Sequence, residues 1–227
     1  MKVHVAFVPD EAASAPTGIV VDVLRATSTI AQALSAGYSR VLCVSEIEDA
    51  RTLRAELPDS VVGGERDAVR IDGFDVGASP REFLERGAET LILSTTNGTR
   101  SIVVAAARCE RVLLGSLLNL DAVASEAREL GDDVAILCAG FKGAFALDDA
   151  YCAGRIVQLL KGRRSDAAVA AATIASAYAT PLEGLNARTY GPPGLEEDIA
   201  FCARENVLDV VPRFQRMVGT CAEIAPA

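Results

Sequence analysis

One pattern occurs twice in this sequence, about 72 residues apart: an apolar run, a polar turn and a helix-like stretch. The run Ile19-Val20-Val21 corresponds to Leu91-Ile92-Leu93, and the turn at 25–27 corresponds to the turn at 97–99. Apolar residues match by chance in many sequences, but here strand, polar turn and helix recur in the same order. We therefore infer that a β-α-β-α-β unit is duplicated in this chain.

The alternation of predicted strands and helices places the chain in the α/β class, with helices packed on a parallel or mixed sheet. We expect one compact unit over 1–227, with internal repeats at approximately 15–80 and 88–160 and a helical C-terminal part. This part includes an Ala-rich helix at 167–179. A turn or short strand at 207–212 then leads into a tail.

The composition limits what the protein binds. A net charge of −9 argues against nucleic acid, and no apolar run approaches the ~20 residues that a membrane span requires. The N-terminal apolar run is too short for a signal peptide, so we expect a cytoplasmic protein. The six cysteines form no CxxC pair and the only histidine, His4, lies in a predicted strand, which disfavours a zinc site and a Ser-His-Asp triad.

Polar residues follow several predicted strands at the point where each strand ends. Asp22, Glu65, the segment 95–97 and Gly140 all hold this position. Ligands of parallel α/β sheets bind beyond the carboxyl ends of the strands. These residues are therefore expected to meet in one site.

The first polar turn combines Asp22 and Arg25 with three hydroxyl residues, Thr27, Ser28 and Thr29. An arginine and the free N–H groups of a helix start can hold a phosphate, and a carboxylate at a strand end can hold Mg²⁺. The alternative is an ordinary helix start that the hydroxyl groups cap.

The second turn is polar along its whole length and contains one glycine, which lets several N–H groups point at one anion. Its residues are Thr95, Thr96, Asn97, Gly98 and Thr99. It has Ser94 and Asn97 where the first turn has Asp22 and Arg25. We therefore expect the metal and the phosphate at the first turn and the other end of the substrate at the second, although a capped helix explains this turn too.

Two further pairs carry charge near strand ends. Glu65 and Arg66 follow an apolar strand and two glycines, which suits a metal ligand or general base beside an anion clamp. Asp148 and Asp149 open a helix, but neighbouring helical residues point ~100° apart, so we expect only one of them to face an ion. Carboxylates without nitrogen or sulfur ligands favour Mg²⁺, and together with arginines they suggest metal-assisted phosphoryl transfer to water. No Walker A sequence is present, which favours a small phosphorylated substrate over a nucleotide.

A set of motifs in a fixed order identifies a family resemblance over roughly residues 1–215. The motifs are Val21-Asp22-Val23-Leu24-Arg25-Ala26-Thr27-Ser28-Thr29, Gly64-Glu65-Arg66, Gly73-Phe74-Asp75 with Ser79-Pro80, Thr95-Thr96-Asn97-Gly98-Thr99, Gly115-Ser116 with Asn119, Cys138-Ala139-Gly140, and Asp149 with Ala153-Gly154. In this the chain resembles the 2-phosphosulfolactate phosphatases of coenzyme M biosynthesis. The resemblance implies a Mg²⁺-dependent hydrolase that converts 2-phospho-3-sulfolactate to 3-sulfolactate and phosphate.

On this basis we expect specific roles for the residues above. The expected metal ligands are Asp22, Glu65 and Asp149. The expected catalytic residues are Asp22, Arg25, Glu65 and Arg66. The expected substrate-binding residues are Thr27, Ser28, Thr29, Thr95, Thr96, Asn97, Gly98, Thr99, Ser79 and Lys142. The metal would activate a water molecule; in an alternative mechanism, Asp22 is a nucleophile and forms an acyl phosphate.

Other interpretations remain open at this point. The family usually has Asn where Ala78 stands, and Lys142 adds a cation, so another 2-phospho acid is an alternative substrate. A non-catalytic protein that binds small phosphorylated or sulfonated acids is the alternative from another class. We also expect a homodimer, on the grounds of the apolar helix at 167–179 and of family habit.

Overall fold

The computed structural model describes residues 1–11, 13–191 and 193–227. Its strands are β1 (Lys2–Ala6), β2 (Thr17–Val21), β3 (Arg40–Val44), β4 (Val61–Arg66), β5 (Val69–Arg70), β6 (Thr90–Ser94), β7 (Arg111–Gly115), β8 (Val134–Cys138), β9 (Arg163–Arg164), β10 (Pro212–Val218) and β11 (Cys221–Pro226). Its helices are α1 (Ala26–Ser35), α2 (Ile47–Glu56), α3 (Gly98–Arg108), α4 (Leu120–Leu130), α5 (Leu147–Leu159), α6 (Asp166–Ser176), α7 (Pro181–Asn186) and α8 (Glu196–Cys202), with a short 3₁₀ helix, η1 (Pro80–Phe83). No helix in the described part of the chain is long and apolar enough to cross a membrane.

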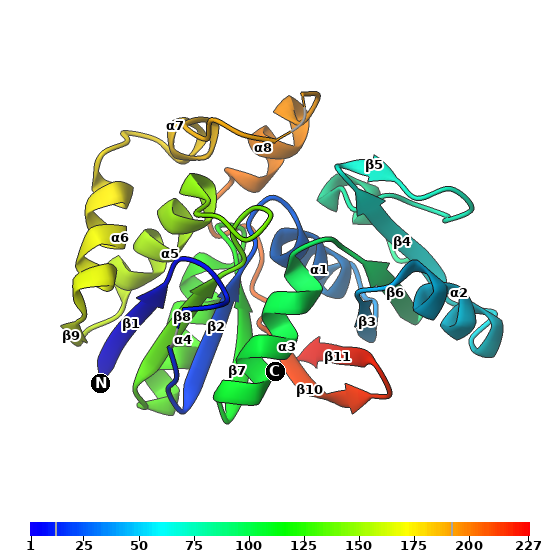
Figure 1. The fold of residues 1–227 in the computed structure, drawn as a ribbon, viewed down its shortest axis with the longest axis horizontal. Coiled ribbons are helices and arrows are strands. Elements are labelled where there is room, and N and C mark those ends of the chain that lie inside the picture. The colour runs from blue at the N-terminus through cyan, green and yellow to red at the C-terminus, as the bar shows by residue number, and fades with distance from the viewer. Residues whose placement is uncertain (12, 192) are drawn as a thin grey trace.

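All the strands join one mixed sheet in the order β5-β4-β6-β3-β11-β10-β7-β2-β8-β1-β9. Two parallel arms, β4-β6-β3 and β7-β2-β8-β1, flank the antiparallel hairpin β10-β11. The predicted α/β class with a mixed sheet is therefore confirmed. Figure 1 shows the hairpin at the base of the molecule, between the two arms.

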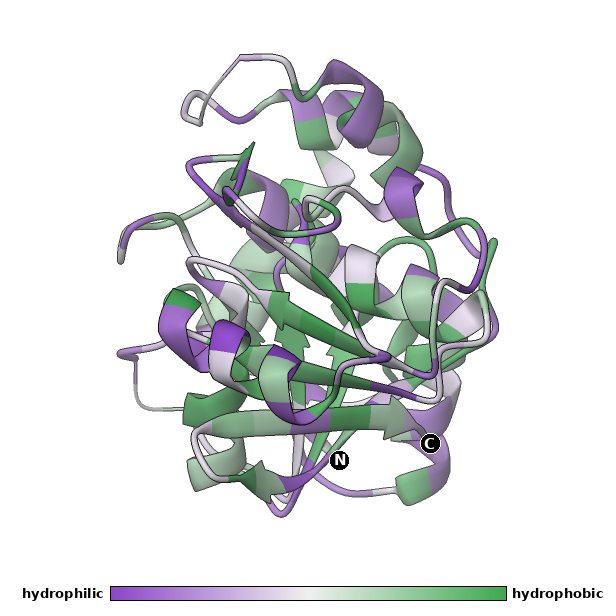
Figure 2. Cartoon of the chain, turned by 90° about the vertical axis from the view of Figure 1, so that its right-hand side faces the viewer, coloured by the Kyte–Doolittle hydropathy of each residue, from purple (hydrophilic) through white to green (hydrophobic). Residues whose placement is uncertain are grey.

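The sheet bends around helices α1 and α3. One core cluster contains Ile30 and Ile102 from these helices together with residues of both arms, such as Val20 and Leu91, and Ile224 of the hairpin. The outer faces of the arms have their own cores, one under α4, α5 and α6 and the other beside α2. Because the central strands are covered on both faces, they are buried at every position and mostly apolar (Figure 2).

The two arms have equivalent strand orders. The predicted first copy supplies β2, β3 and β4, and the second supplies β6, β7 and β8. In the sheet, β6 lies between β3 and β4, and β2 lies between β7 and β8. The central strands β6 and β2 are thus each flanked by two strands of the other predicted copy. An exchange of one strand between two duplicated units would give this order. The duplication itself stays a prediction.

The tail expected after residue 212 is wrong, because this segment is the hairpin at the centre of the sheet. β11 pairs antiparallel with β3, and β10 pairs antiparallel with β7. The error has a physical cause: β10 is exposed along its second half. Ala222 and Ile224 of β11 are buried, whereas Met217 and Val218 of β10 are exposed, so no long apolar run marks the hairpin.

The Ala-rich helix expected at 167–179 is α6, and it is buried on one side only. Ala168, Ala171 and Ala175 pack in the core with α5, while Val169 is exposed. The homodimer expected through this helix stays a prediction.

The position of the hairpin leads to a stability prediction. Replacing Ile224 by Ala removes a fully buried side chain from the core cluster that residues of both arms share, so we expect a loss of about 2–5 kcal/mol in the free energy of unfolding. Met217→Ala, at an exposed position of the hairpin, is the control, and its expected effect is within about 0.5 kcal/mol. Urea unfolding followed by circular dichroism measures both, and equal small effects would contradict the central role of the hairpin.

Candidate active site

A pocket opens where the carboxyl ends of β2, β4 and β6 meet, the place where α/β sheets bind their ligands. Its walls come from five parts of the chain that lie far apart in sequence. They include Asp22, Leu24, Arg25, Ala26, Glu65, Asp67, Ala68, Ala78, Thr95, Thr96, Asn97, Phe141, Lys142, Asp148, Arg188, Tyr190, Gly191 and Leu195. The strand-end residues expected to meet in one site are thus brought together, apart from Gly140, which lies behind the wall.

Asp22 lies at the start of α1 with its carboxylate in the pocket wall. Its Oδ1 accepts a hydrogen bond from the backbone N–H of Ala26 at 3.2 Å, and Oδ2 has no such partner among the described residues. The pKa of Asp22 is raised to about 7, chiefly by burial; Asp148 and Glu65 contribute to the rise, while the Ala26 N–H and Arg25 oppose it. A cation beside Oδ2 would therefore stabilise the ionised form.

The three hydroxyl groups of the first turn do not reach the pocket. Thr27 donates to the carbonyl of Asp22 at 2.9 Å, and Ser28 donates to the carbonyl of Val23 at 2.8 Å. All three side chains are fully buried and none of them caps the start of α1, so they bind neither a ligand in the pocket nor the free N–H groups of the helix start.

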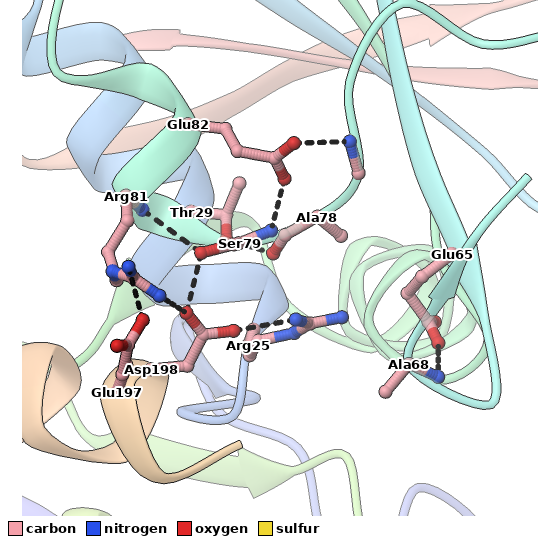
Figure 3. A network of polar contacts seen from close by, with 11 residues as sticks. Arg25, Thr29, Glu65, Ala68, Ala78, Ser79, Arg81, Glu82, Glu197 and Asp198 are labelled. Atoms are coloured by element: carbon pink, nitrogen blue, oxygen red, sulfur yellow. Dashed lines mark hydrogen bonds and ion pairs between the residues drawn. The ribbon is translucent and has the colours of Figure 1, made fainter. Parts of the chain in front are cut away.

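Thr29 has a similar structural role farther along α1. Its hydroxyl donates to the carbonyl of Ala78 at 2.8 Å and ties the helix to the segment before η1 (Figure 3). The hydroxyl side chains at 27–29 thus stabilise the turn that presents Asp22 and Arg25.

Glu65 lies at the end of β4 and lines the pocket, but its oxygens are occupied. Oε1 accepts from the backbone N–H of Thr96 at 3.1 Å and from its hydroxyl at 3.0 Å, and Oε2 accepts from the N–H of Ala68 at 2.7 Å. Glu65 therefore joins the second turn to the end of β4. Any metal bound here would share these oxygens with their present donors.

The second turn places some of its predicted residues in the pocket and others behind it. Thr95, Thr96 and Asn97 line the pocket, whereas Thr99 is buried and donates to the carbonyl of Val44 at 3.2 Å. The hydroxyl of Thr95 accepts from the Thr99 N–H at 3.4 Å, much as Asp22 accepts from an N–H of its own helix start.

Gly98 is required because the starts of α1 and α3 touch. A Cβ at Gly98 would overlap the Cβ of Ala26 and lie 3.0 Å from Oδ2 of Asp22. Gly98 and Ala26 are also counterparts in the sequence repeat, 72 residues apart. The contact between the helix starts is what brings both polar turns to one pocket.

The two acidic residues at the start of α5 have different roles, because neighbouring helical side chains point in different directions. Asp149 accepts from the backbone N–H of Val23 at 2.9 Å and from that of Gly140 at 3.0 Å, so both its oxygens hold the ends of β2 and β8. It does not line the pocket. Asp148 does, and its Oδ1 accepts from the hydroxyl of Tyr190 and the N–H of Asp149. Burial raises the pKa of both carboxyl groups, with their mutual repulsion adding to the rise at Asp149.

The two predicted arginines lie on different sides of the wall. Arg25 lines the pocket, and its Nη1 donates to Asp198 of α8 at 2.6 Å (Figure 3). Arg66 points away: its Nη2 donates to the carbonyl of Ser45 at 2.5 Å and to the hydroxyl of Ser94 at 3.1 Å. It borders a separate groove beside α3. Arg66 therefore does not reach the pocket that contains Asp22.

Two weaker candidates also differ in their positions. Ser79 caps η1 and donates to Asp198 at 2.5 Å, which places it behind Arg25 (Figure 3). Lys142 lines the pocket, and its ammonium group forms a 2.8 Å ion pair with Asp67. Both partners are exposed, so this pair lies at the rim.

The sequence analysis did not identify four residues of this region. Arg188 and Tyr190 line the pocket, the ring of Tyr190 packs against Phe141 at 4.6 Å between centroids, and Asp198 holds Arg25. Arg188, Tyr190 and Asp198 lie in a loop or on a short helix without a strand end beside them in sequence, whereas Phe141 follows the end of β8 by three residues. Only the tertiary structure shows that these residues lie close to Asp22 and Arg25.

Four carboxylates (Asp22, Glu65, Asp67, Asp148) and three cationic side chains (Arg25, Lys142, Arg188) line the pocket. Within the described ranges, no group of three or more histidine, cysteine or acidic side chains is arranged to hold a metal ion alone. Mg²⁺ does not need such a group, since it keeps several waters and binds through one or two carboxylates and substrate phosphate. The donor set therefore fits Mg²⁺ through Asp22 and Asp148, with a ligand completing the coordination.

The pocket at the strand ends of this α/β sheet contains buried carboxylates, an arginine and two touching helix starts. Such a site is typical of proteins that bind a small anion. The family model described as 2-phosphosulpholactate phosphatase matches residues 4–217. The chain therefore belongs to this family, and it is a phosphoric monoester hydrolase.

Individual relatives agree with the family match. A protein of Thermus thermophilus named probable 2-phosphosulfolactate phosphatase is 38% identical over 231 residues, which cover 96% of this chain and 97% of that protein. Its namesake in Carboxydothermus hydrogenoformans is 36% identical over 222 residues, covering 93% and 92% of the two chains. A third, from Thermotoga petrophila, is 37% identical over 218 residues, covering 92% and 94%.

The contact of the two helix starts can be tested by exchanging its side chains. Gly98→Ala introduces a Cβ that pushes α3 away from α1 and from Asp22, so we expect phosphatase activity to fall about 100-fold, as for a ~1 Å misplacement. Adding Ala26→Gly removes the opposing Cβ and should restore a large part of the activity. Phosphate release measures both variants, and circular dichroism checks folding. A double variant as inactive as Gly98→Ala would contradict this account.

Proposed function

We propose that this protein is a Mg²⁺-dependent phosphatase of small 2-phospho acids, and that its substrate is 2-phospho-3-sulfolactate. The observation that carries the proposal is the place of Asp22. Its buried carboxylate has one oxygen on the start of α1 and the other free in the pocket, with Arg25 on the same wall. The names of the relatives support the choice of substrate.

Electrostatics support the metal. The substrate carries a phosphate, a carboxylate and a sulfonate, whereas the pocket lining has four acidic and three basic side chains. A trianionic or more highly charged ligand would be repelled by such a lining without an added cation. Mg²⁺ bound by Asp22 and Asp148, with Glu65 beside them, would offset that repulsion. Asp149, expected earlier as a ligand, is a poorer choice because both its oxygens accept backbone hydrogen bonds.

Each wall of the pocket has a distinct role in this proposal. Bound Mg²⁺ would lower the pKa of a water molecule and offset charge that develops on the phosphoryl group. Arg25 binds phosphoryl oxygens through the N–H groups that Asp198 leaves free. Arg188 and Lys142, with the backbone of the second turn, bind the carboxylate or the sulfonate. Asp22 as the nucleophile is the competing mechanism.

We predict that phosphate release from 2-phospho-3-sulfolactate requires Mg²⁺ and Asp22. Asp22→Asn keeps the shape of the side chain but removes its charge, so we expect at least a 100-fold fall in kcat, as for loss of a group that stabilises the transition state. Isothermal titration of Mg²⁺ provides a second readout and should show weaker binding by the same variant. Asp72→Asn, on an exposed loop away from the pocket, is the matched control and should behave like the wild type.

Several outcomes would contradict parts of this proposal. Full activity in the presence of a chelator would exclude the metal, and an active Asp22→Asn variant would exclude both mechanisms. A higher turnover of another 2-phospho acid would replace the substrate but keep the enzyme class. Binding of the compound without phosphate release under any divalent metal would favour the non-catalytic alternative.

A further inference from the structure

The guanidinium of Arg25 is held by a carboxylate from the far end of the chain. Nη1 of Arg25 donates to Oδ2 of Asp198 at 2.6 Å, across 173 residues of sequence. The exposed fractions of the two side chains are only 9% and 6%. Two buried charges are stable when each has a well-placed partner, so this pair fixes the position of both groups.

The other oxygen of Asp198 is held as well. Oδ1 accepts a hydrogen bond from the hydroxyl of Ser79 at 2.5 Å and lies 3.6 Å from Nη1 of Arg81. Ser79 is itself fixed, because its N–H donates to Glu82 at 3.3 Å in the capping box of η1. Figure 3 shows Asp198 between η1 on one side and Arg25 on the other. The carboxylate therefore cannot rotate without losing a donor.

Arg25 keeps donors that Asp198 does not use. A guanidinium has five N–H donors in a planar fork, and Asp198 occupies one edge of it. Among the described residues, no other hydrogen-bond acceptor is found for this guanidinium. Arg25 lines the pocket, whereas Asp198 does not. The remaining donors are thus available to an oxyanion in the pocket.

We propose that Asp198 is a positioning residue, which holds the guanidinium of Arg25 in the orientation that binds the phosphoryl group in the transition state. The proposal rests on the proposed function, in which Arg25 contacts the phosphate. Asp198 acts through Arg25 alone and touches no substrate. The helix α8 is then part of the catalytic architecture, although Asp198 lies 173 positions from Arg25 in sequence.

The size of the effect follows from the length of the arginine side chain. Arginine has several rotatable bonds, and ordering it on each catalytic cycle would oppose the reaction entropically. A misplacement of about 1 Å of a group that contacts the transition state can lower the rate ~100-fold. Because ground-state binding depends on several other groups, the loss is expected mainly in kcat and less in KM.

The decisive variant is Asp198→Asn in the full chain with Mg²⁺ and 2-phospho-3-sulfolactate. We expect kcat to fall about 10- to 100-fold and KM to change by less than about threefold. Glu197→Gln is the matched control. Glu197 is the neighbouring acid on α8 and also pairs with Arg81, but it is exposed and does not contact Arg25. Its kcat should stay within about twofold of the wild type.

A double-mutant cycle separates positioning from a general loss of structure. If Asp198 acts through Arg25, then Asp198→Asn should lower the rate of an Arg25→Ala enzyme by less than about twofold. An equal loss of kcat with and without Arg25, or no loss in Asp198→Asn alone, would overturn the proposal. If Asp198→Asn does not fold, Ser79→Ala removes one donor from Asp198 with little change in packing. It should then lower kcat about threefold in the wild type and not in Arg25→Ala.

A second measurement does not depend on turnover. Inorganic phosphate with Mg²⁺ should raise the Tm of the wild type and, by the same amount, the Tm of Glu197→Gln. The rise in Tm should be smaller in Asp198→Asn and absent in Arg25→Ala. If the wild type hydrolyses no 2-phospho acid, the proposed function fails, and this series still tests the coupling. The same phosphate-induced rise in Asp198→Asn as in the wild type would then overturn the positioning role.

Discussion

The contact between Ala26 and Gly98 is the constraint on which the site depends. Helices α1 and α3 start from strands in different arms of the sheet, and each crosses to the other arm. Their starts meet only because Gly98 has no side chain to keep Ala26 away. Two helix starts at one point bring two sets of backbone N–H groups and two polar turns together, which neither arm provides alone.

Burial of acid groups follows from this arrangement. Asp22 and Asp148 lie in a wall with little contact to water, and burial raises the pKa of each. Under the proposed function, a cation bound beside these carboxylates and Arg25 would favour a compact, highly charged phosphate ester over an apolar one.

The sequence was informative where local pattern decides structure. Runs such as Val20 and its neighbours are apolar at every position because both faces of the arms are covered, so the strands and the positions of Asp22, Glu65 and Thr95 at their ends were predictable. The directions of the side chains were not. Thr27, Ser28 and Thr29 look like ligands in sequence, yet each hydroxyl satisfies a backbone carbonyl, and sequence alone does not distinguish these two uses.

The other errors came from contacts between distant segments. Arg66 follows Glu65 directly, but consecutive residues of a strand point to opposite faces, so the two side chains diverge. The hairpin carrying Ile224 has a weak apolar pattern because the second half of β10 is exposed.

The two turns also show why a duplicated unit can give a single asymmetric site. By position in the sheet, Asp22 follows the last residue of β2 as Thr95 follows the last residue of β6, so the counterpart of Asp22 is Thr95 and not Ser94. Each side chain accepts a hydrogen bond from its own helix start. Only Asp22 adds a charge, and only the first turn has an arginine that the C-terminal part can hold. Segments outside both predicted copies supply Arg188, Tyr190 and Asp198, so the repeat provides the frame and the C-terminal part makes its two ends different.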